Sequence, residues 1–338
     1  MLVDCFIQRE PGFRKANEDR VWPSRTRRVR LSYRMRRITR GREVPVRQAY
    51  RSGALVADQT DHQVPLRAAF RRSWAPVDGA CGSSSGRIVV GLFDATEWLD
   101  WLPEATLLLH QSERARVARL RNAALRDTRI QAYALHRLLL GQVLGVDPTR
   151  VRLYRDSLGC PRVVGDQVWT SLSHADHAIA VAVSVDGPVG IDIELKQRCH
   201  AMADIAGRVC HPDELARVAG WPHQDTDVDL LELWVAKEAL LKAAGIGLEV
   251  EMDRFAIDAV QDCKALGRAR HLPVRLLDVG DEWVAAVAGA PGARLFGGWI
   301  DPAADRPRVH SKLVTRPWGR PAGEASRVQI SEPLTRVS

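Results

Sequence analysis

The sequence lacks paired cysteines and long apolar runs. Its six cysteines are scattered, without a Cys-x-x-Cys pair and without a secretory signal ahead of them. This pattern predicts reduced thiols in a cytoplasmic protein rather than a disulfide scaffold. The longest aliphatic run, around residues 178–185, is far too short for a membrane helix, which needs roughly 20 apolar residues. We therefore expect no membrane-spanning segment.

Acidic residues are scarce at the beginning of the chain. Residues 1–86 hold 18 Lys/Arg and 8 Asp/Glu, which gives this segment a net charge of +10. The whole chain has a net charge of +8, so residues 87–338 together carry −2. This arm has few apolar residues to offset the entropy of ordering, which favours a flexible, solvated segment. Nucleic-acid binding through its basic runs is a less favoured alternative. Residues 82–86 match a Gly-x-Ser-x-Gly nucleophile pattern, but a Ser/Gly hinge fits them better.

The folded part is predicted to begin near Arg87 and to mix helices with strands. Period-two apolar patterns indicate strands, and Ser, Gly and Pro signals bound two helices in the first half and further helices in the second. The expected strands are 87–93, 151–154, 168–171, 178–185, 189–194, 255–260, 274–279 and 282–288, and the main expected helices are 112–125, 127–145 and 229–248. The fold class is therefore α+β.

The segment 189–194 alternates strictly. Its aliphatic residues point to one face of a strand, and Asp192 and Glu194 point to the other. Burial of three aliphatic side chains, at roughly 1.5–3 kcal/mol each, fixes both carboxylates on the opposite side. Such hard oxygen ligands suit Mg²⁺ together with phosphate oxygens. A solvated edge strand would explain an isolated Asp-x-Glu equally well.

The helix expected over 229–248 supplies a third carboxylate. Trp234, Glu238 and Lys242 are spaced four residues apart and form one stripe. An ordinary Glu/Lys pair would account for the last two. With Asp192 and Glu194 upstream, however, Glu238 completes a predicted metal site of three acids.

These motifs resemble a known family. Residues 190–194 (GIDIE), followed about forty residues later by Trp234 to Ala239 (WVAKEA) and Lys242, resemble the signature pair of the 4′-phosphopantetheinyl transferases. The larger single-chain branch, typified by the surfactin-synthetase-activating enzyme, is the most similar. Residues 171–174 (SLSH) resemble its Ser-His motif, and residues 112–114 resemble the start of its first basic helix. The likeness covers residues 87–302.

The resemblance implies an activity and a site. Members transfer the phosphopantetheine arm of coenzyme A to a serine of an apo acyl or peptidyl carrier protein and release adenosine 3′,5′-bisphosphate. Catalysis of such a transfer depends on positioning and charge neutralisation. By this resemblance, Glu238 and Lys242 are catalytic. The metal ligands for Mg²⁺ are Asp192, Glu194 and Glu238, and the coenzyme contacts are Arg114, Ser173, His174, Lys237 and Lys242. Two similar α+β lobes and a monomer are expected.

The resemblance also sets boundaries and leaves gaps. The expected parts are a basic arm (1–86), an N-terminal lobe (87–188), a C-terminal lobe carrying the metal site (189–302) and a flexible tail (303–338). Cys160 stands where many relatives have a phosphate-binding lysine. Many relatives also have an arginine late in the second helix, and Arg137 is slightly displaced in sequence from that position. A Mg²⁺-dependent phosphohydrolase that uses the same carboxylates is the alternative enzyme class.

Overall fold

The computed structural model describes residues 64–79, 86–165, 167–218, 226–302, 309–310, 315–316 and 318. The α-helices are α1 (Leu66–Gly79), α2 (Leu102–Leu108), α3 (Gln111–Val117), α4 (Ala123–Leu144), α5 (Ala206–Val209), α6 (Pro212–Val218) and α7 (Thr226–Ala244). The strands are β1 (Arg87–Asp94), β2 (Leu153–Arg155), β3 (Pro161–Val163), β4 (Trp169–Ala175), β5 (Ala178–Ser184), β6 (Gly190–Leu195), β7 (Val274–Leu277), β8 (Trp283–Ala288), β9 (Arg294–Trp299), β10 (Val309–His310) and β11 (Thr315–Arg316). Eight short 3-10 segments join them: η2 (Ala95–Trp101), η3 (Pro148–Arg150), η4 (Lys196–Ala201), η5 (Ala203–Ile205), η6 (Gly247–Glu249), η7 (Met252–Arg254), η8 (Ile257–Asp262) and η9 (Lys264–His271). This mixed content confirms the α+β class.

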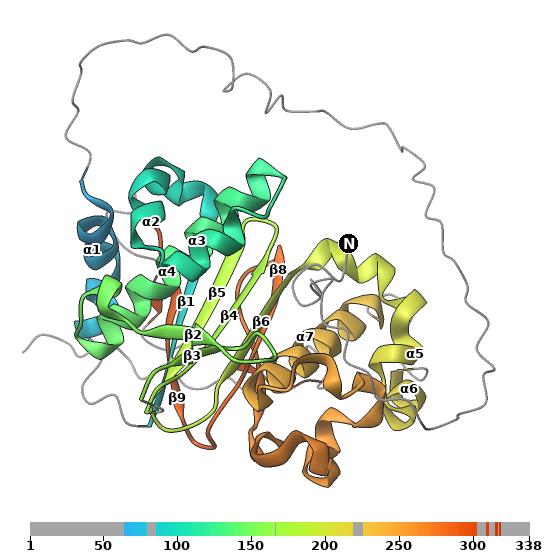
Figure 1. Cartoon of the computed structure of the whole chain (residues 1–338). Helices are drawn as coiled ribbons and strands as arrows, with labels where there is room; N and C mark the ends of the chain where they lie inside the picture. Colours follow the sequence, from blue (N-terminus) through green and yellow to red (C-terminus); the bar gives the residue numbers. More distant parts are fainter. Residues whose placement is uncertain are drawn as a thin grey trace, which may run out of the picture. The chain divides into compact units, whose positions relative to one another are not determined.

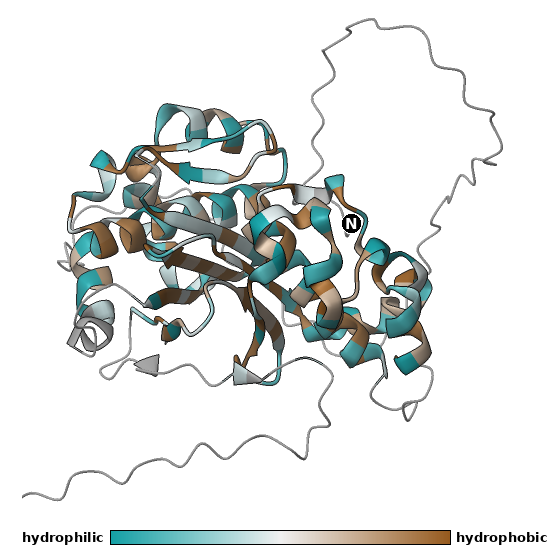
Figure 2. Ribbon diagram, turned by 90° about the horizontal axis from the view of Figure 1, so that it is seen from below, coloured by the Kyte–Doolittle hydropathy of each residue, from teal (hydrophilic) through white to brown (hydrophobic). Residues whose placement is uncertain are grey.

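Two sheets form the centre of the fold. The first has the order β10-β9-β1-β5-β4 and the second β11-β7-β8-β6, while β2 and β3 form a separate hairpin. Most neighbours are antiparallel, but β9 runs parallel to β1. Figure 1 shows α4 beside β1 and β5, and α7 beside the second sheet. Hydrophobic strands lie between helices of mixed polarity (Figure 2).

The alternation of side chains along the strands creates three apolar layers. On β5, Ile179 and Val181 pack with α1, α2 and α4, while Ala180 packs against the second sheet. On β8, Val287 faces the first sheet and Ala286 faces α7. The layers are therefore helices, sheet, sheet and helices. Because each face of both sheets is covered, the strands are apolar almost throughout.

The amino-terminal arm is shorter than predicted. Residues 66–79 form α1, and its Phe70 and Trp74 are buried in the core beside Phe93 and Trp98. The Glu104 carboxylate accepts a hydrogen bond from the backbone N–H of Leu66 at the helix start (2.9 Å). The boundary at residue 86 was therefore wrong, because the aromatic residues of α1 supply the apolar surface that the basic runs lack. The predicted hinge, apart from Gly86, and residues 1–63 lie outside the described residues.

Three other expectations differ from the structure. The first predicted helix ends earlier, and Asn122 caps α4 by accepting the N–H of Leu125 (3.1 Å). Residues 255–260 are not a strand, since η8 occupies most of them. The region after 302 includes β10, β11 and the buried Trp318, so the tail is not wholly outside the fold. The strand β9 was missed. It lies inside the range predicted for the C-terminal lobe (189–302) but joins the first sheet beside β1, so that range does not form one separate unit.

Candidate active site

The predicted site lies where the edge strands of the two sheets meet. The edge strand β4 lies beside the edge strand β6, and the backbone N–H of Ile191 donates to Ser171 Oγ (3.1 Å). Val189, Ile191 and Ile193 are buried between the sheets, as the alternation predicted. Asp192 lies on the opposite face of β6, toward α7.

Three residues from three elements form the centre of the site. Lys242 Nζ of α7 lies 2.5 Å from Asp192 Oδ1 of β6 and donates to Ser173 Oγ of β4 (2.8 Å). The Ser173 hydroxyl in turn donates to the same Asp192 oxygen (2.7 Å). The side chains of Lys242 and Asp192 are only 9% and 7% exposed, so water screens this charged triangle weakly. The sequence reasoning had selected all three residues.

Glu194 and Glu238 lie within electrostatic range of Asp192. Burial, followed by repulsion from Asp192, raises the pKa of the Glu194 carboxyl to about 7. The same two causes raise the pKa of Glu238 to about 7, and Glu194 adds to the repulsion. Arg198 Nη1 lies 2.9 Å from Glu194 Oε2 and partly offsets this repulsion. The three predicted acids therefore share one negative field, which the charge of Lys242 only partly neutralises.

The donor set fits a hard divalent cation in chemistry but is not arranged around one. Among the described residues, no group of three or more His, Cys, Asp or Glu side chains is arranged to hold a metal ion. The positive charge nearest to Asp192 is the Lys242 ammonium. Carboxylates whose mutual repulsion raises their pKa gain from a shared cation. Asp192, Glu194 and Glu238 are thus the residues that would hold Mg²⁺.

His174 faces a second, positively charged region. Neighbouring strand residues point to opposite faces, so Ser173 contacts Asp192 while His174 turns toward α4. Burial, then the charges of Arg129, Lys242 and Arg155, lower the pKa of His174 to about 3. The imidazole is therefore neutral at physiological pH.

The sequence reasoning missed the arginines of this region. Arg129 of α4 and Arg155 of β2 both lie near Tyr133, and the Arg155 guanidinium is 5.4 Å from the Tyr133 ring. Burial lowers the pKa of Arg155, and Arg116 and Arg129 lower it further, while Tyr133 and Glu113 oppose this. Several guanidinium groups that gather with little acidic compensation create a positive potential that attracts anions. Only the helical period of residues 127–145 hinted at it, since Arg129 and Tyr133 are four apart.

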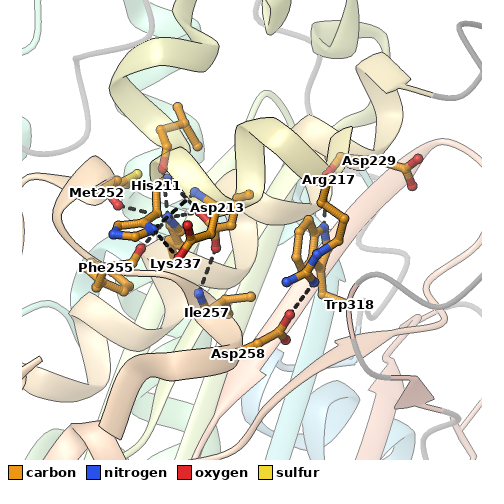
Figure 3. A network of polar contacts seen from close by, with 12 residues as sticks. His211, Asp213, Arg217, Asp229, Lys237, Met252, Phe255, Ile257, Asp258 and Trp318 are labelled. Carbon is orange, nitrogen blue, oxygen red and sulfur yellow. Dashed lines mark hydrogen bonds and ion pairs between the residues drawn. The ribbon is translucent and has the colours of Figure 1, made fainter. Parts of the chain in front are cut away.

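Two predicted coenzyme contacts have other roles in the structure. Lys237 is fully buried on another face of α7, and its Nζ donates to Glu214 Oε2 (2.5 Å) and to the carbonyl oxygens of Val209, Met252 and Phe255 (Figure 3). Its donors are all used, so its prediction as a coenzyme contact was wrong. Arg114 is exposed, and its guanidinium donates to the Leu107 carbonyl (3.2 Å). In the described part of the chain it has no polar contact with the other predicted site residues.

Two sequence departures have structural explanations. Cys160 is buried, and burial raises the pKa of its thiol, so the side chain stays neutral and supplies neither a positive nor a negative charge. Arg137 is buried on α4, where it pairs with Glu113 (2.7 Å) and donates to the carbonyls of Pro148 and Val151. Arg137 therefore fixes α3 and the turn after α4 rather than a ligand.

Comparison with known proteins identifies one family. The sequence model of the 4′-phosphopantetheinyl transferase superfamily matches residues 188–288, which include β6, α7 and β8. The 4′-phosphopantetheinyl transferase HetI of a Nostoc species is 31% identical over 46% of this chain and 67% of its own length. A 4′-phosphopantetheinyl transferase of Bacillus subtilis is 31% identical over 46% of this chain and 74% of its own. The Aneurinibacillus migulanus transferase gsp is 31% identical over 38% of this chain and 52% of its own.

The chain therefore belongs to the 4′-phosphopantetheinyl transferase superfamily and is an enzyme of that class. Transfer of phosphopantetheine to carrier proteins is the reaction that this class supports. Among the described helices, none combines the length and apolar character that crossing a bilayer requires.

Proposed function

We propose that this enzyme transfers the 4′-phosphopantetheine arm of coenzyme A to a serine of an apo acyl or peptidyl carrier protein, with Mg²⁺, and releases adenosine 3′,5′-bisphosphate. The observation that supports this most directly is the Asp192, Lys242 and Ser173 triangle beside two carboxylates of raised pKa. A phosphoryl transfer needs neutralised phosphate oxygens, an aligned nucleophile and a proton acceptor. These residues can contribute to each need.

The charge of each site residue determines the role that we propose for it. Lys242, anchored by Asp192 and Ser173, holds a positive charge where a pyrophosphate would lie. Glu238 has a pKa of about 7, and this value suits acceptance of a proton from the attacking serine hydroxyl near neutral pH. Glu194 is held by Arg198 and adds a second carboxylate beside Asp192. The nucleophile belongs to the partner.

The metal would be held by Asp192, Glu194 and Glu238. When bound, Mg²⁺ supplies charge neutralisation for the pyrophosphate. Proton binding to Glu194 and Glu238 competes with metal binding, because both carboxyls titrate near neutrality. This donor set is therefore expected to bind the cation better at pH 8 than at pH 6.

The positive region on the other side of β4 suits the phosphate at the nucleotide end of the coenzyme. His174 is neutral and can donate or accept one hydrogen bond, while Arg129 and Arg155 supply charge. Within the part of the chain that the structure describes, the buried Nε of Arg129 has no hydrogen-bond partner, and a buried unpaired donor favours an acceptor. We assign the phosphate contacts to these residues in place of Arg114 and Lys237.

The remaining proposals concern organisation. We propose that the two α+β layers on either side of the β4 and β6 junction correspond to the two similar lobes of the family fold, with residues 1–63 as the basic arm. A monomeric state and a cytoplasmic location remain predictions of the sequence. Salt-sensitive nucleic-acid binding by the arm would be independent of Asp192.

Intact-mass spectrometry of an apo carrier protein tests the activity. Incubation with the enzyme, coenzyme A and Mg²⁺ is expected to add one phosphopantetheine mass to the carrier. Asp192→Ala and Glu238→Gln should abolish the gain, whereas Glu251→Gln, an exposed acid paired with Arg254 outside the site, should not. Normal transfer by either site variant contradicts the proposed site. Phosphate release from coenzyme A without a carrier would instead indicate the phosphohydrolase alternative.

A further inference from the structure

Gly190 marks a close approach of α7 to β6. A Cβ added to Gly190 would lie 1.9 Å from the carbonyl oxygen of Ala239 and 2.5 Å from the backbone nitrogen of Ala243. Both atoms are backbone, so no side-chain rotation can relieve the contact. Gly190 lies within the regular strand β6, so its small size, rather than an unusual backbone angle, is what this position requires.

The contact lies next to the charged triangle. Gly190 and Asp192 are two residues apart and share one face of β6, and Lys242 adjoins Ala243 on the contacting turn of α7. The Lys242 to Asp192 distance of 2.5 Å therefore depends on the spacing between β6 and α7 at this turn. A real Cβ keeps at least 3.0 Å from such atoms, so it would move the helix by roughly 1 Å, a displacement that can cost about 10²-fold in rate.

We propose that Gly190 is a positioning residue for the transfer: the missing Cβ sets the β6 to α7 spacing at which Lys242 contacts Asp192 and Glu238 lies within electrostatic range of it. Gly190 touches no reacting atom in this account. Its effect passes through the helix backbone to the two side chains that do. The catalytic part of this inference rests on the proposed function, whereas the spacing part does not.

Gly297 offers a control at which Ala is strained at least as much, because its φ of +128° adds backbone strain to the close contact. A Cβ at Gly297 would lie 1.7 Å from the carbonyl oxygen of Val90, a contact at least as severe. This contact joins β9 to β1, which β5 separates from β4 and the site. Gly190→Ala and Gly297→Ala therefore both strain the core, but only the first moves α7 relative to Asp192.

The test combines transfer with a readout that needs no activity. The Lys242 side chain is 9% exposed and ion-paired, so acetic anhydride should modify it slowly, as measured by peptide mass spectrometry. Gly190→Ala is expected to speed this labelling several-fold and to lower transfer at least ten-fold more than Gly297→Ala does. Labelling of Lys242 at the wild-type rate in Gly190→Ala, or equal loss of transfer in both variants, overturns the proposal. Absence of transfer by the wild-type enzyme refutes the proposed function, while the labelling comparison still tests the spacing.

A second variant covers the case in which Gly190→Ala does not fold. Asp192→Glu in the native background adds one methylene to a carboxylate that already contacts Lys242. If Gly190 fixes a close spacing, the longer side chain cannot fit without displacing Lys242, so labelling should rise and transfer should fall at least ten-fold. Wild-type labelling and transfer by Asp192→Glu would show that the spacing is not fixed and would overturn the proposal.

Discussion

Helix α7 carries two lysines that form ion pairs of opposite character. Lys237 and Glu214 are both fully buried, and every donor of the ammonium has an acceptor. Lys242 and Asp192 are slightly exposed and share their surroundings with Glu194 and Glu238, whose pKa values are raised to about 7. The charges of Lys237 and Glu214 balance each other. The charge of Lys242, in contrast, faces Asp192 together with the two neighbouring glutamates. Such incomplete compensation costs stability and is typical of binding and catalytic sites.

The largest effect on stability is expected at the pair of Lys237 and Glu214. Lys237→Met leaves Glu214 buried without its cation, which should lower the free energy of unfolding by about 3–5 kcal/mol. Chemical denaturation measures this loss. The double variant Lys237→Met with Glu214→Gln should recover part of it, because no charge is then stranded. A single-variant loss below roughly 1 kcal/mol would contradict the structural role.

The pair of Lys242 and Asp192 should affect activity more than stability. Lys242→Met removes the charge beside Asp192 and is expected to lower phosphopantetheine transfer by about 10²-fold or more. It should destabilise the protein less than Lys237→Met does, because Glu194 and Glu238 can neutralise themselves by binding protons. Transfer assays and thermal unfolding, run in parallel on both variants, measure the contrast. Equal activity loss in the two variants would remove the distinction between the pairs.

The raised pKa values of Glu194 and Glu238 predict a pH-dependent stability. The folded protein holds protons on these carboxyls that the unfolded chain has released above its usual carboxyl pKa of about 4.5. Their contribution to stability is therefore present at low pH and is lost as pH rises toward about 7. We expect each to lower stability by roughly 3 kcal/mol over this window, because each pKa unit corresponds to about 1.4 kcal/mol. Thermal unfolding without divalent cations should show the slope, and Glu238→Gln should reduce it. If Glu238→Gln leaves the pH dependence of the unfolding temperature unchanged, groups other than Glu238 cause that dependence.

The smallest effect is expected at the rim of the site. Arg198 is 34% exposed and pairs with Glu194, and solvent-exposed pairs contribute roughly 0.2–1 kcal/mol. Arg198→Ala should change stability by no more than this and should raise the pKa of Glu194 further. The pH profile of thermal unfolding would then shift upward in pH. An effect as large as that of Lys237→Met would mean that Glu194 depends on Arg198 for its folded position.

The sequence predicted those positions of the site that follow from the two-residue repeat of a strand and the 3.6-residue repeat of a helix. Alternation over 189–194 correctly placed Asp192 opposite the buried aliphatics, and the four-residue spacing correctly associated Glu238 with Lys242. Lys237 was misassigned because it is a sequence neighbour of Glu238. Helical geometry turns successive residues by 100°, so Lys237 faces a different part of the protein. The three carboxylates were expected to converge on one ion, and their arrangement around Mg²⁺ stays a proposal.

The remaining errors came from contacts between distant segments. Arg155 and Arg129 belong to different elements, and no local pattern shows that both approach His174. The strand β9 contains Gly297 and Gly298, which weaken strand propensity, yet its pairing with β1 decides its conformation. Helix α1 was hidden among basic residues, although Phe70 and Trp74 were its apolar anchors.

The return of β9 to the first sheet affects how the protein can unfold or be divided. β9 is inserted between β10 and β1, although the chain reaches it only after completing β7 and β8. Cutting the polypeptide between its halves would leave β1 with an unpaired edge and would leave β9 paired only with the two-residue strand β10. We therefore expect a single calorimetric transition for both halves, and neither half should persist as an independent folding module.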